Sequence, residues 1–272
     1  MDSLFSVKDK NIVITGGAGV LGTSLAQALA AAGARVCISD MDAQGAESLC
    51  QKIKDAGGFA VPIKTDVLDK ESVQQAASGV MESLGGIDIL INAAGGNKKE
   101  ATTGPDMSFF DMPADALRWV FNLNLMGTIL PSQVFGRTMA DQGHGIILNV
   151  SSMSAFSALT KVGAYSAAKA AVSNFTQWLS VHMCQNYSTQ IRVNAIAPGF
   201  FLTQQNQFLL TDEATGELTP RGKTIIDHTP MGRFGEAEEL VGTVIWLLSD
   251  ASKFVTGIVV PIDGGFNAFS GV

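Results

Sequence analysis

The chain contains 272 residues, 46% of them apolar, and carries a formal net charge of −7. This length and composition suit one large core, so we expect residues 1–272 to form a single domain. The acidic charge argues against nucleic acid or an anionic membrane as a partner.

Apolar segments alternate with helical patterns along the whole chain, which indicates repeated βαβ units and a parallel sheet. Strands are expected at 11–15, 35–39, 59–64, 87–92, 145–150, 190–195 and 257–261. Helices are expected at 21–32, 43–56, 70–84, 114–139, from the region of 165 to 187, and at 237–248. The predicted fold is therefore α/β, a single Rossmann-like doubly wound parallel sheet of about seven strands with helices on both faces. Segments 97–113 and 200–230 interrupt this alternation and are predicted to be substrate loops.

The three cysteines, Cys37, Cys50 and Cys184, are widely spaced and form no CxxC motif. Such cysteines are expected to be reduced and mostly buried, and no metal site is predicted from them. Residues 1–8 lack a basic stretch followed by an apolar one, and no run of about 20 apolar residues occurs. The sequence thus predicts a cytoplasmic protein with no membrane partner.

A glycine-rich segment, Thr15–Gly22, lies between the first expected strand and the first expected helix. Its glycines satisfy G-x-G-x-x-G, and in this position they let backbone amides approach the pyrophosphate of a dinucleotide. The alternative is a glycine-rich turn with a purely structural role. The predicted cofactor contacts in this segment are Gly16, Gly19, Leu21 and Gly22.

An acidic residue, Asp40, ends the second expected strand, eighteen residues after Gly22. A carboxylate at this distance can accept hydrogen bonds from an adenosine ribose and would repel a 2′-phosphate. No Arg or Lys occurs within 38–44 to bind that phosphate, so the sequence predicts NAD(H) rather than NADP(H). The alternative is that Asp40 only caps the following helix.

Further candidate cofactor contacts follow the third and fourth expected strands. Ligands bind beyond the carboxyl ends of strands in open parallel sheets. Asp66 and Val67 are placed to flank an adenine there, and Asn92, Ala93 and Ala94 are placed to pass beside a ribose.

Tyr165 and Lys169 are four residues apart in an expected helix, and Ser152 precedes them by thirteen residues. Residues at this spacing share a helix face, about 5–6 Å apart. A cation about 4 Å from the phenol would favour the phenolate by roughly 4 kcal/mol, or about three pKa units, and so allow proton exchange near pH 7. Ser152 would hold the same substrate oxygen. The alternative is that the pair consists of ordinary helix residues.

Together these residues resemble the short-chain dehydrogenases/reductases over essentially the whole chain. The resemblance is carried by Thr15–Gly22, Asp66, Asn92–Gly95, Asn124, Ser152, Tyr165, Lys169 and 194–199. One residue departs from the family's T-G-x-x-x-G-x-G pattern: Val20 occupies the position of the middle glycine, so the pyrophosphate contacts there are open.

The resemblance implies roles for the catalytic residues. Tyr165 would be the general acid/base, and Lys169 would modify its pKa and bind a ribose. Ser152 would stabilise the substrate oxygen, and Asn124 would anchor a water-linked proton relay.

The resemblance also implies which residues contact the nicotinamide and how many subunits the protein has. Pro198 and Gly199 would border the nicotinamide, with Thr203 near its carboxamide. Homotetramers are common in the family, so a homotetramer is implied here by analogy.

A narrower similarity connects 92–97, 101–103 and 218–231 with bacterial D-mannonate oxidoreductases of the short-chain type (fructuronate reductases). It implies an NAD-dependent interconversion of a secondary alcohol and a ketone in a small-molecule sugar acid. The expected substrate contacts are Asn97, Ser152, Ser154 and Tyr165. Cationic or polar side chains in the two irregular segments could bind the acid group: Lys98, Lys99, Arg221, Lys223 and His228. The alternatives are a 3-oxoacyl thioester reductase, another short-chain sugar or polyol dehydrogenase, and a catalytically silent dinucleotide sensor.

Overall fold

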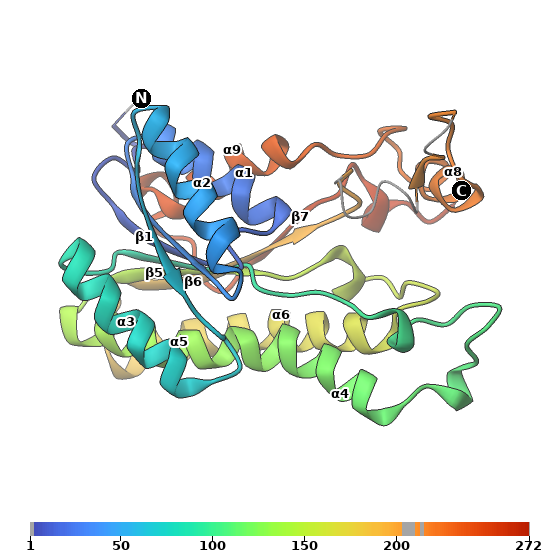
Figure 1. The fold of residues 1–272 in the computed structure, drawn as a ribbon, viewed down its shortest axis with the longest axis horizontal. Coiled ribbons are helices and arrows are strands. Elements are labelled where there is room, and N and C mark those ends of the chain that lie inside the picture. The colour runs from blue at the N-terminus through green and yellow to red at the C-terminus, as the bar shows by residue number, and fades with distance from the viewer. Residues whose placement is uncertain (1–2, 203–209, 213–214, 272) are drawn as a thin grey trace.

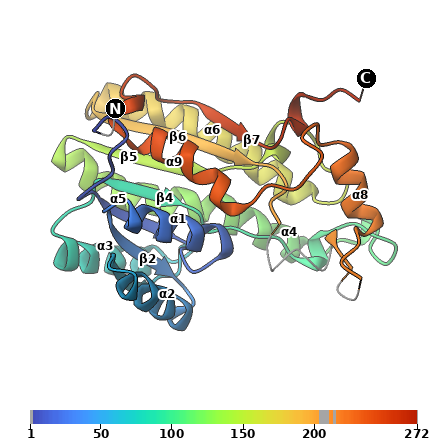
Figure 2. The same ribbon diagram turned by 90° about the horizontal axis from the view of Figure 1, so that it is seen from above.

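A parallel sheet forms the centre of the computed structural model, which describes residues 3–202, 210–212 and 215–271. In these ranges the sheet has seven strands in the order β3-β2-β1-β4-β5-β6-β7, and every neighbouring pair is parallel (Figure 2). The strands are β1 (Asn11–Thr15), β2 (Arg35–Asp40), β3 (Phe59–Lys64), β4 (Ile89–Asn92), β5 (Gly145–Val150), β6 (Ile191–Pro198) and β7 (Val259–Ile262). Pro62, which has no N–H for a strand ladder, lies in the edge strand β3.

Helices cover both faces of this sheet (Figure 1). One face carries α1 (Val20–Ala31), α2 (Ala43–Asp55) and α9 (Val241–Leu248), and the other carries α3 (Lys70–Leu84), α5 (Gly127–Gln142) and α6 (Gly163–Asn186). The shorter helices α4 (Ala114–Phe121) and α8 (Pro220–Asp227) lie at one end of the molecule. This architecture confirms the predicted single Rossmann-like α/β domain.

The alternation of side chains along the strands explains the two helical layers. In β1, Ile12 and Ile14 point into the core beneath α1 and α2, whereas Val13 points into the core beneath α3 and α5; all three are fully buried. Successive side chains of a strand point to opposite faces, so a continuously apolar strand requires a helix on each side. In the part of the chain that the structure describes, no helix is both long and apolar enough to cross a membrane.

Two predicted helices differ from the observed structure. The helix predicted at 237–248 begins with a 3-10 turn, Ala237–Leu240, before α9. The pattern predicts an unbroken helix over 114–139, but α4 ends at Phe121, and a π-helical turn, Asn122–Met126, precedes α5. Asn124 Nδ2 donates to the Val120 carbonyl at 2.8 Å, and Thr128 Oγ1 donates to the Asn124 carbonyl at 2.9 Å. Single π-helical turns within helices occur frequently at functional sites.

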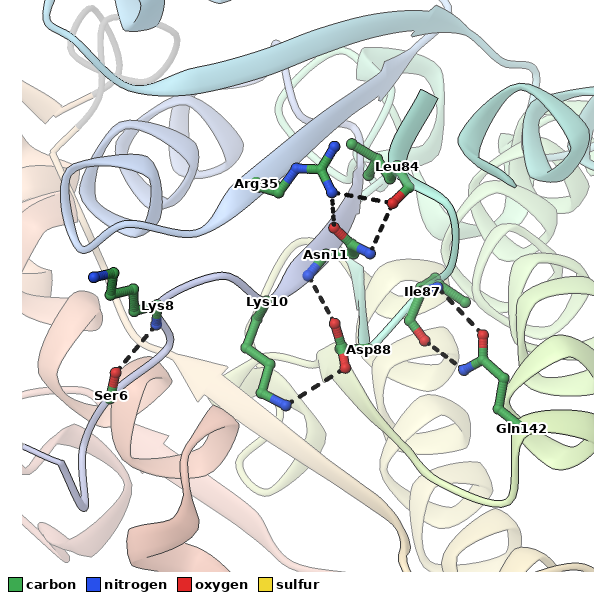
Figure 3. Close-up of polar contacts among 9 residues, drawn as sticks. All are labelled: Ser6, Lys8, Lys10, Asn11, Arg35, Leu84, Ile87, Asp88 and Gln142. Atoms are coloured by element: carbon green, nitrogen blue, oxygen red, sulfur yellow. Dashed lines mark hydrogen bonds and ion pairs between the residues drawn. The ribbon is translucent and has the colours of Figure 1, made fainter. Parts of the chain in front are cut away.

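A polar network ties together the amino-terminal ends of the central strands (Figure 3). Asn11 donates its backbone N–H to Asp88 Oδ2 at 2.9 Å and its side-chain amide to the Leu84 carbonyl at 3.2 Å. Arg35 donates to the same Leu84 carbonyl at 3.1 Å, and Gln142 bonds to both backbone groups of Ile87. Because the strands are parallel, this network lies at the end of the sheet opposite their carboxyl ends. Its polar residues therefore stabilise the fold.

Candidate active site

A cleft of about 960 Å³ opens at the carboxyl ends of the strands. This volume is at the upper end of the range for ligand pockets, about 300–1,000 Å³, as a dinucleotide together with a small substrate requires. Most residues predicted from the sequence line it: Gly16, Gly19, Leu21, Gly22, Asp40, Asp66, Val67, Ala93, Ala94, Asn97, Asn124, Ser152, Tyr165, Lys169, Pro198 and Gly199. Thr203 lies outside the described residues.

The glycine-rich turn meets steric requirements that explain its sequence. Gly16 has φ +64°, and a Cβ there would lie 2.7 Å from Ala94 Cα. At Gly22 a Cβ would collide with the backbone of Gly16 and Gly17. Val20, by contrast, is the first residue of α1 and has ordinary helical backbone, so no glycine is needed there.

The amino terminus of α1 fits a pyrophosphate. Gly19 is its N-cap residue and provides no side-chain hydrogen bond to the first turn. The first N–H groups of a helix have no intrahelical partners and carry partial positive charge, which favours an anion. These amides therefore could bind the phosphates of a dinucleotide.

Asp40 connects the end of β2 to the glycine-rich turn. One carboxylate oxygen accepts from the Ala18 N–H at 2.9 Å, and the other accepts from the Asp42 N–H at 3.0 Å. The N-cap residue of α2 is Asp42, whose side chain accepts from Gly45 N–H at 3.0 Å, so the alternative that Asp40 caps this helix is wrong. Asp40 lines the cleft with lone pairs to spare for a ligand hydroxyl.

Two of the predicted contact residues lie outside the cleft. Asn92 is buried and donates to Ser132 Oγ at 3.0 Å and to Asn149 Oδ1 at 2.9 Å, so its side chain joins β4, β5 and α5. Ser154 is also buried; its backbone N–H donates to Ser152 Oγ at 3.2 Å. Position at a strand end did not distinguish side chains that face the core from those that face the cleft.

Tyr165, Lys169 and Ser152 meet at the base of the cleft, as predicted. The first two come from the start of α6, and Ser152 follows β5 and is hydrogen-bonded to Tyr165. Lys169 is only 4% exposed, and its Nζ donates to the Val150 carbonyl at 2.8 Å. The same Nζ lies 5.7 Å from the centre of the Tyr165 ring.

The pKa of Tyr165 corrects the prediction from the sequence. Burial raises the pKa of this phenol above its ordinary value of 10.0, although the hydrogen bond to Ser152 acts in the opposite direction. Burial also lowers the pKa of Lys169 from 10.5 to about 8. Desolvation disfavours the charged form of both groups. Desolvation therefore has the largest effect on the pKa of Tyr165.

Asn124 holds the segment after β4 through its side chain. It donates to the Gly96 carbonyl at 2.7 Å and accepts from the Gly96 N–H at 3.3 Å. At Gly95, a Cβ would lie 2.7 Å from Asn124 Oδ1 and 3.2 Å from Lys169 Nζ, so a side chain would intrude between the two. Asn97 follows at the cleft rim and donates to Thr102 Oγ1 at 2.9 Å.

Some apolar residues of the cleft were not predicted from the sequence. They are Trp119, Leu123, Phe200 and Phe201. Trp119 and Leu123 are four residues apart, a spacing that places them on one helix face and could have identified them together. Within the described ranges, no group of three or more His, Cys, Asp or Glu residues could hold a metal ion.

The cleft and fold agree with the comparison to known families. The family model described as enoyl-(acyl carrier protein) reductase matches residues 16–267. The chain therefore belongs to the short-chain dehydrogenases/reductases, as its motifs predicted, and is an oxidoreductase.

Three proteins are similar to this chain over nearly its whole length. "Uncharacterized oxidoreductase UxuB" of Bacillus subtilis is 47% identical and aligns over 97% of this chain and 96% of its own. A crystal structure of a candidate D-mannonate oxidoreductase from Haemophilus influenzae with bound NAD is 43% identical, with a TM-score of 0.92 and coverage of 100% and 99%. A gluconate 5-dehydrogenase from Burkholderia cenocepacia, in complex with NADP and tartrate, is 31% identical, with a TM-score of 0.86 and coverage of 98% for both chains.

Proposed function

We propose that the protein is an NAD(H)-dependent oxidoreductase that interconverts a secondary alcohol and a ketone in a sugar acid of the D-mannonate/D-fructuronate type. The observation that carries this proposal is the placement of Tyr165, Ser152 and Lys169 in the same cleft as the glycine-rich turn. The substrate class is supported by the sugar-acid names of two similar structures.

The residues at the base of the cleft divide the reaction between them. A bound nicotinamide supplies the hydride in reduction and accepts it in oxidation. In reduction, Tyr165 gives its phenolic proton to the substrate oxygen while a C–H bond forms at the carbonyl carbon. Ser152 donates a hydrogen bond to that oxygen. The phenolate then regains a proton from solvent through Lys169 and a water-linked relay that Asn124 would anchor. The raised pKa of Tyr165 keeps the phenol protonated, as a proton donor must be.

The preference for NAD(H) over NADP(H) is proposed from Asp40. Its carboxylate stands beside the glycine-rich turn, where it would accept from a ribose hydroxyl and repel a phosphate. Asp40→Ala should therefore raise kcat/KM with NADPH by about tenfold or more relative to NADH. Asp69→Ala is a matched control, since Asp69 caps α3 and does not line the cleft. Equal efficiency of the wild type with both coenzymes would contradict the assignment.

An NADH-oxidation screen tests the proposed activity. Fructuronate and tagaturonate should be turned over, beside simple ketones and acetoacetyl thioesters as comparisons. Activity confined to the thioesters would exclude the sugar-acid proposal in favour of a 3-oxoacyl thioester reductase. Tyr165→Phe should lower kcat by about 10²- to 10⁴-fold and leave NADH binding intact. NADH binding without turnover, the same in this variant and in the wild type, would indicate a dinucleotide sensor.

We also propose that the protein assembles as a homotetramer, as its resemblance to the family implies. Large side chains on α6 and just after it are exposed in the single chain: Trp178, Val181 and Tyr187 are 54–55% exposed. Burial of this surface between copies would stabilise an assembly. Sedimentation equilibrium should give four times the mass of the 28.5 kDa chain; a monomer would exclude the proposal.

A further inference from the structure

A lysine whose backbone is fixed follows Asn97, a residue that lines the cleft. Lys98 follows the segment that Asn124 holds through Gly96. Its carbonyl accepts from Thr102 Oγ1 at 2.8 Å and from the Ala101 N–H at 3.1 Å. The position of Lys98 is thereby tied to that of Asn124.

The side chain of Lys98 is oriented by an aromatic ring. Its Nζ lies 4.1 Å from the centre of the Trp119 ring, and the side chain is partly buried. Trp119 lines the cleft and packs, like Tyr165, against the small apolar cluster of Ala101, Ala116 and Val120. The ammonium group is therefore held against an aromatic ring that lines the cleft.

No carboxylate forms an ion pair with Lys98 among the residues that the structure describes. A cation–π contact orients an ammonium without neutralising it. Lys169, the cation within the cleft, is buried and donates to Val150, which leaves it poorly placed for an acid group. The chain has a net charge of −7 and therefore repels an anionic substrate, so binding such a substrate requires a cation close to the site.

The other candidate cations are less well placed. Arg221 and Lys223 belong to α8, and no residue of α8 lines the cleft. Lys98 is not itself a lining residue, but it adjoins two that are: Asn97 in sequence and Trp119 in space.

We propose that Lys98, held against the Trp119 ring, binds the carboxylate of the substrate and so selects keto acids over neutral ketoses. This inference rests on the proposed function, because it concerns the acid group of the sugar acid. Asn124 and Trp119 act as positioning residues for Lys98.

The test compares a keto acid with its uncharged ester. In Lys98→Gln, KM for fructuronate should rise by about 10- to 100-fold, the range for a hydrogen bond to a charged group, with little change in kcat. For the methyl ester of fructuronate, kcat/KM should be the same in the variant and the wild type. Lys98→Arg should restore most of the affinity, and Lys99→Gln, at the adjacent exposed lysine, should leave KM unchanged.

Two results would overturn the inference. An unchanged KM for fructuronate in Lys98→Gln would exclude Lys98 as the carboxylate ligand. An equal loss with acid and ester would show a structural role, which a lowered melting temperature would accompany. Failure of the proposed function is seen separately, in a wild type that turns over neither keto acid.

Discussion

Asn124 and Gly96 are joined by a reciprocal pair of hydrogen bonds, with Nδ2 donating to the carbonyl at 2.7 Å and Oδ1 accepting from the N–H at 3.3 Å. A third bond, from Nδ2 to the Val120 carbonyl at 2.8 Å, fixes the side chain to the helix that carries it. One buried amide thus connects the π-helical turn to the backbone at the substrate end of the cleft.

Asn124→Ala should loosen this connection. It leaves backbone groups without partners, and each buried unsatisfied group costs about 1–3 kcal/mol. We expect a lower free energy of unfolding and a higher KM for the keto acid, measured by urea denaturation and steady-state kinetics. Thr128→Val is the control, since it removes a buried hydrogen bond to the Asn124 carbonyl without touching Gly96. If the control raised KM as much as Asn124→Ala, the link to the cleft would be disproved.

The ionisation of Tyr165 can be measured directly, because the chain has only two tyrosines. Subtracting the ultraviolet titration of Tyr165→Phe from that of the wild type isolates this phenol. Burial should keep its midpoint above the ordinary value of 10.0 in the protein without coenzyme. A midpoint near pH 7 would instead support the sequence-based prediction that Lys169 favours the phenolate.

The buried ammonium of Lys169 should make stability depend on pH. Its folded pKa of about 8 lies below the ordinary 10.5, so between these values the unfolded chain binds more protons and stability rises with pH. The wild type should gain on the order of 3 kcal/mol over Lys169→Met across this window. Urea unfolding of both proteins from pH 7 to 10.5 gives this difference. A constant difference would show that burial does not shift the pKa.

Much of the fold could be predicted because local signals agree with the tertiary structure. The strands at 11–15, 59–64 and 145–150 match the observed bounds residue for residue. They are apolar runs between turn residues, and parallel pairing then brings their carboxyl ends to one edge. The predicted residues at those ends therefore meet in one cleft without any knowledge of side-chain contacts.

The features that were missed depend on contacts between distant parts of the chain. The π-helical turn is not visible in the apolar pattern of 114–139, because the residues before and after this single wide turn are still helical. The pKa of Tyr165 depends on how deeply the site is buried, which spacing along a helix does not reveal. The contact of Lys98 with Trp119 joins residues 21 positions apart.

Substitutions at Gly22 and at Val20, the residue that departs from the family pattern, should affect NADH binding differently. Gly22→Ala forces a Cβ against the backbone of Gly16 and Gly17, so the turn must shift and its amides move away from the pyrophosphate. We expect the Kd for NADH to rise at least about tenfold, a loss of about 1.4 kcal/mol. Val20→Gly restores the family's glycine at a position with helical backbone, so it should change Kd by less than about threefold and cost up to about 1 kcal/mol of stability.

Fluorescence titration with NADH, together with urea denaturation, measures both quantities for the two variants. Stronger NADH binding by Val20→Gly, by tenfold or more, would mean that the valine side chain obstructs the pyrophosphate and that the turn is an impaired form of the family's motif. Equal Kd values for Gly22→Ala and the wild type would mean that the coenzyme does not depend on the close packing of this turn. The steric contacts favour neither outcome, because a Cβ at Gly22 would collide with the backbone, whereas Val20 already occupies the first position of α1.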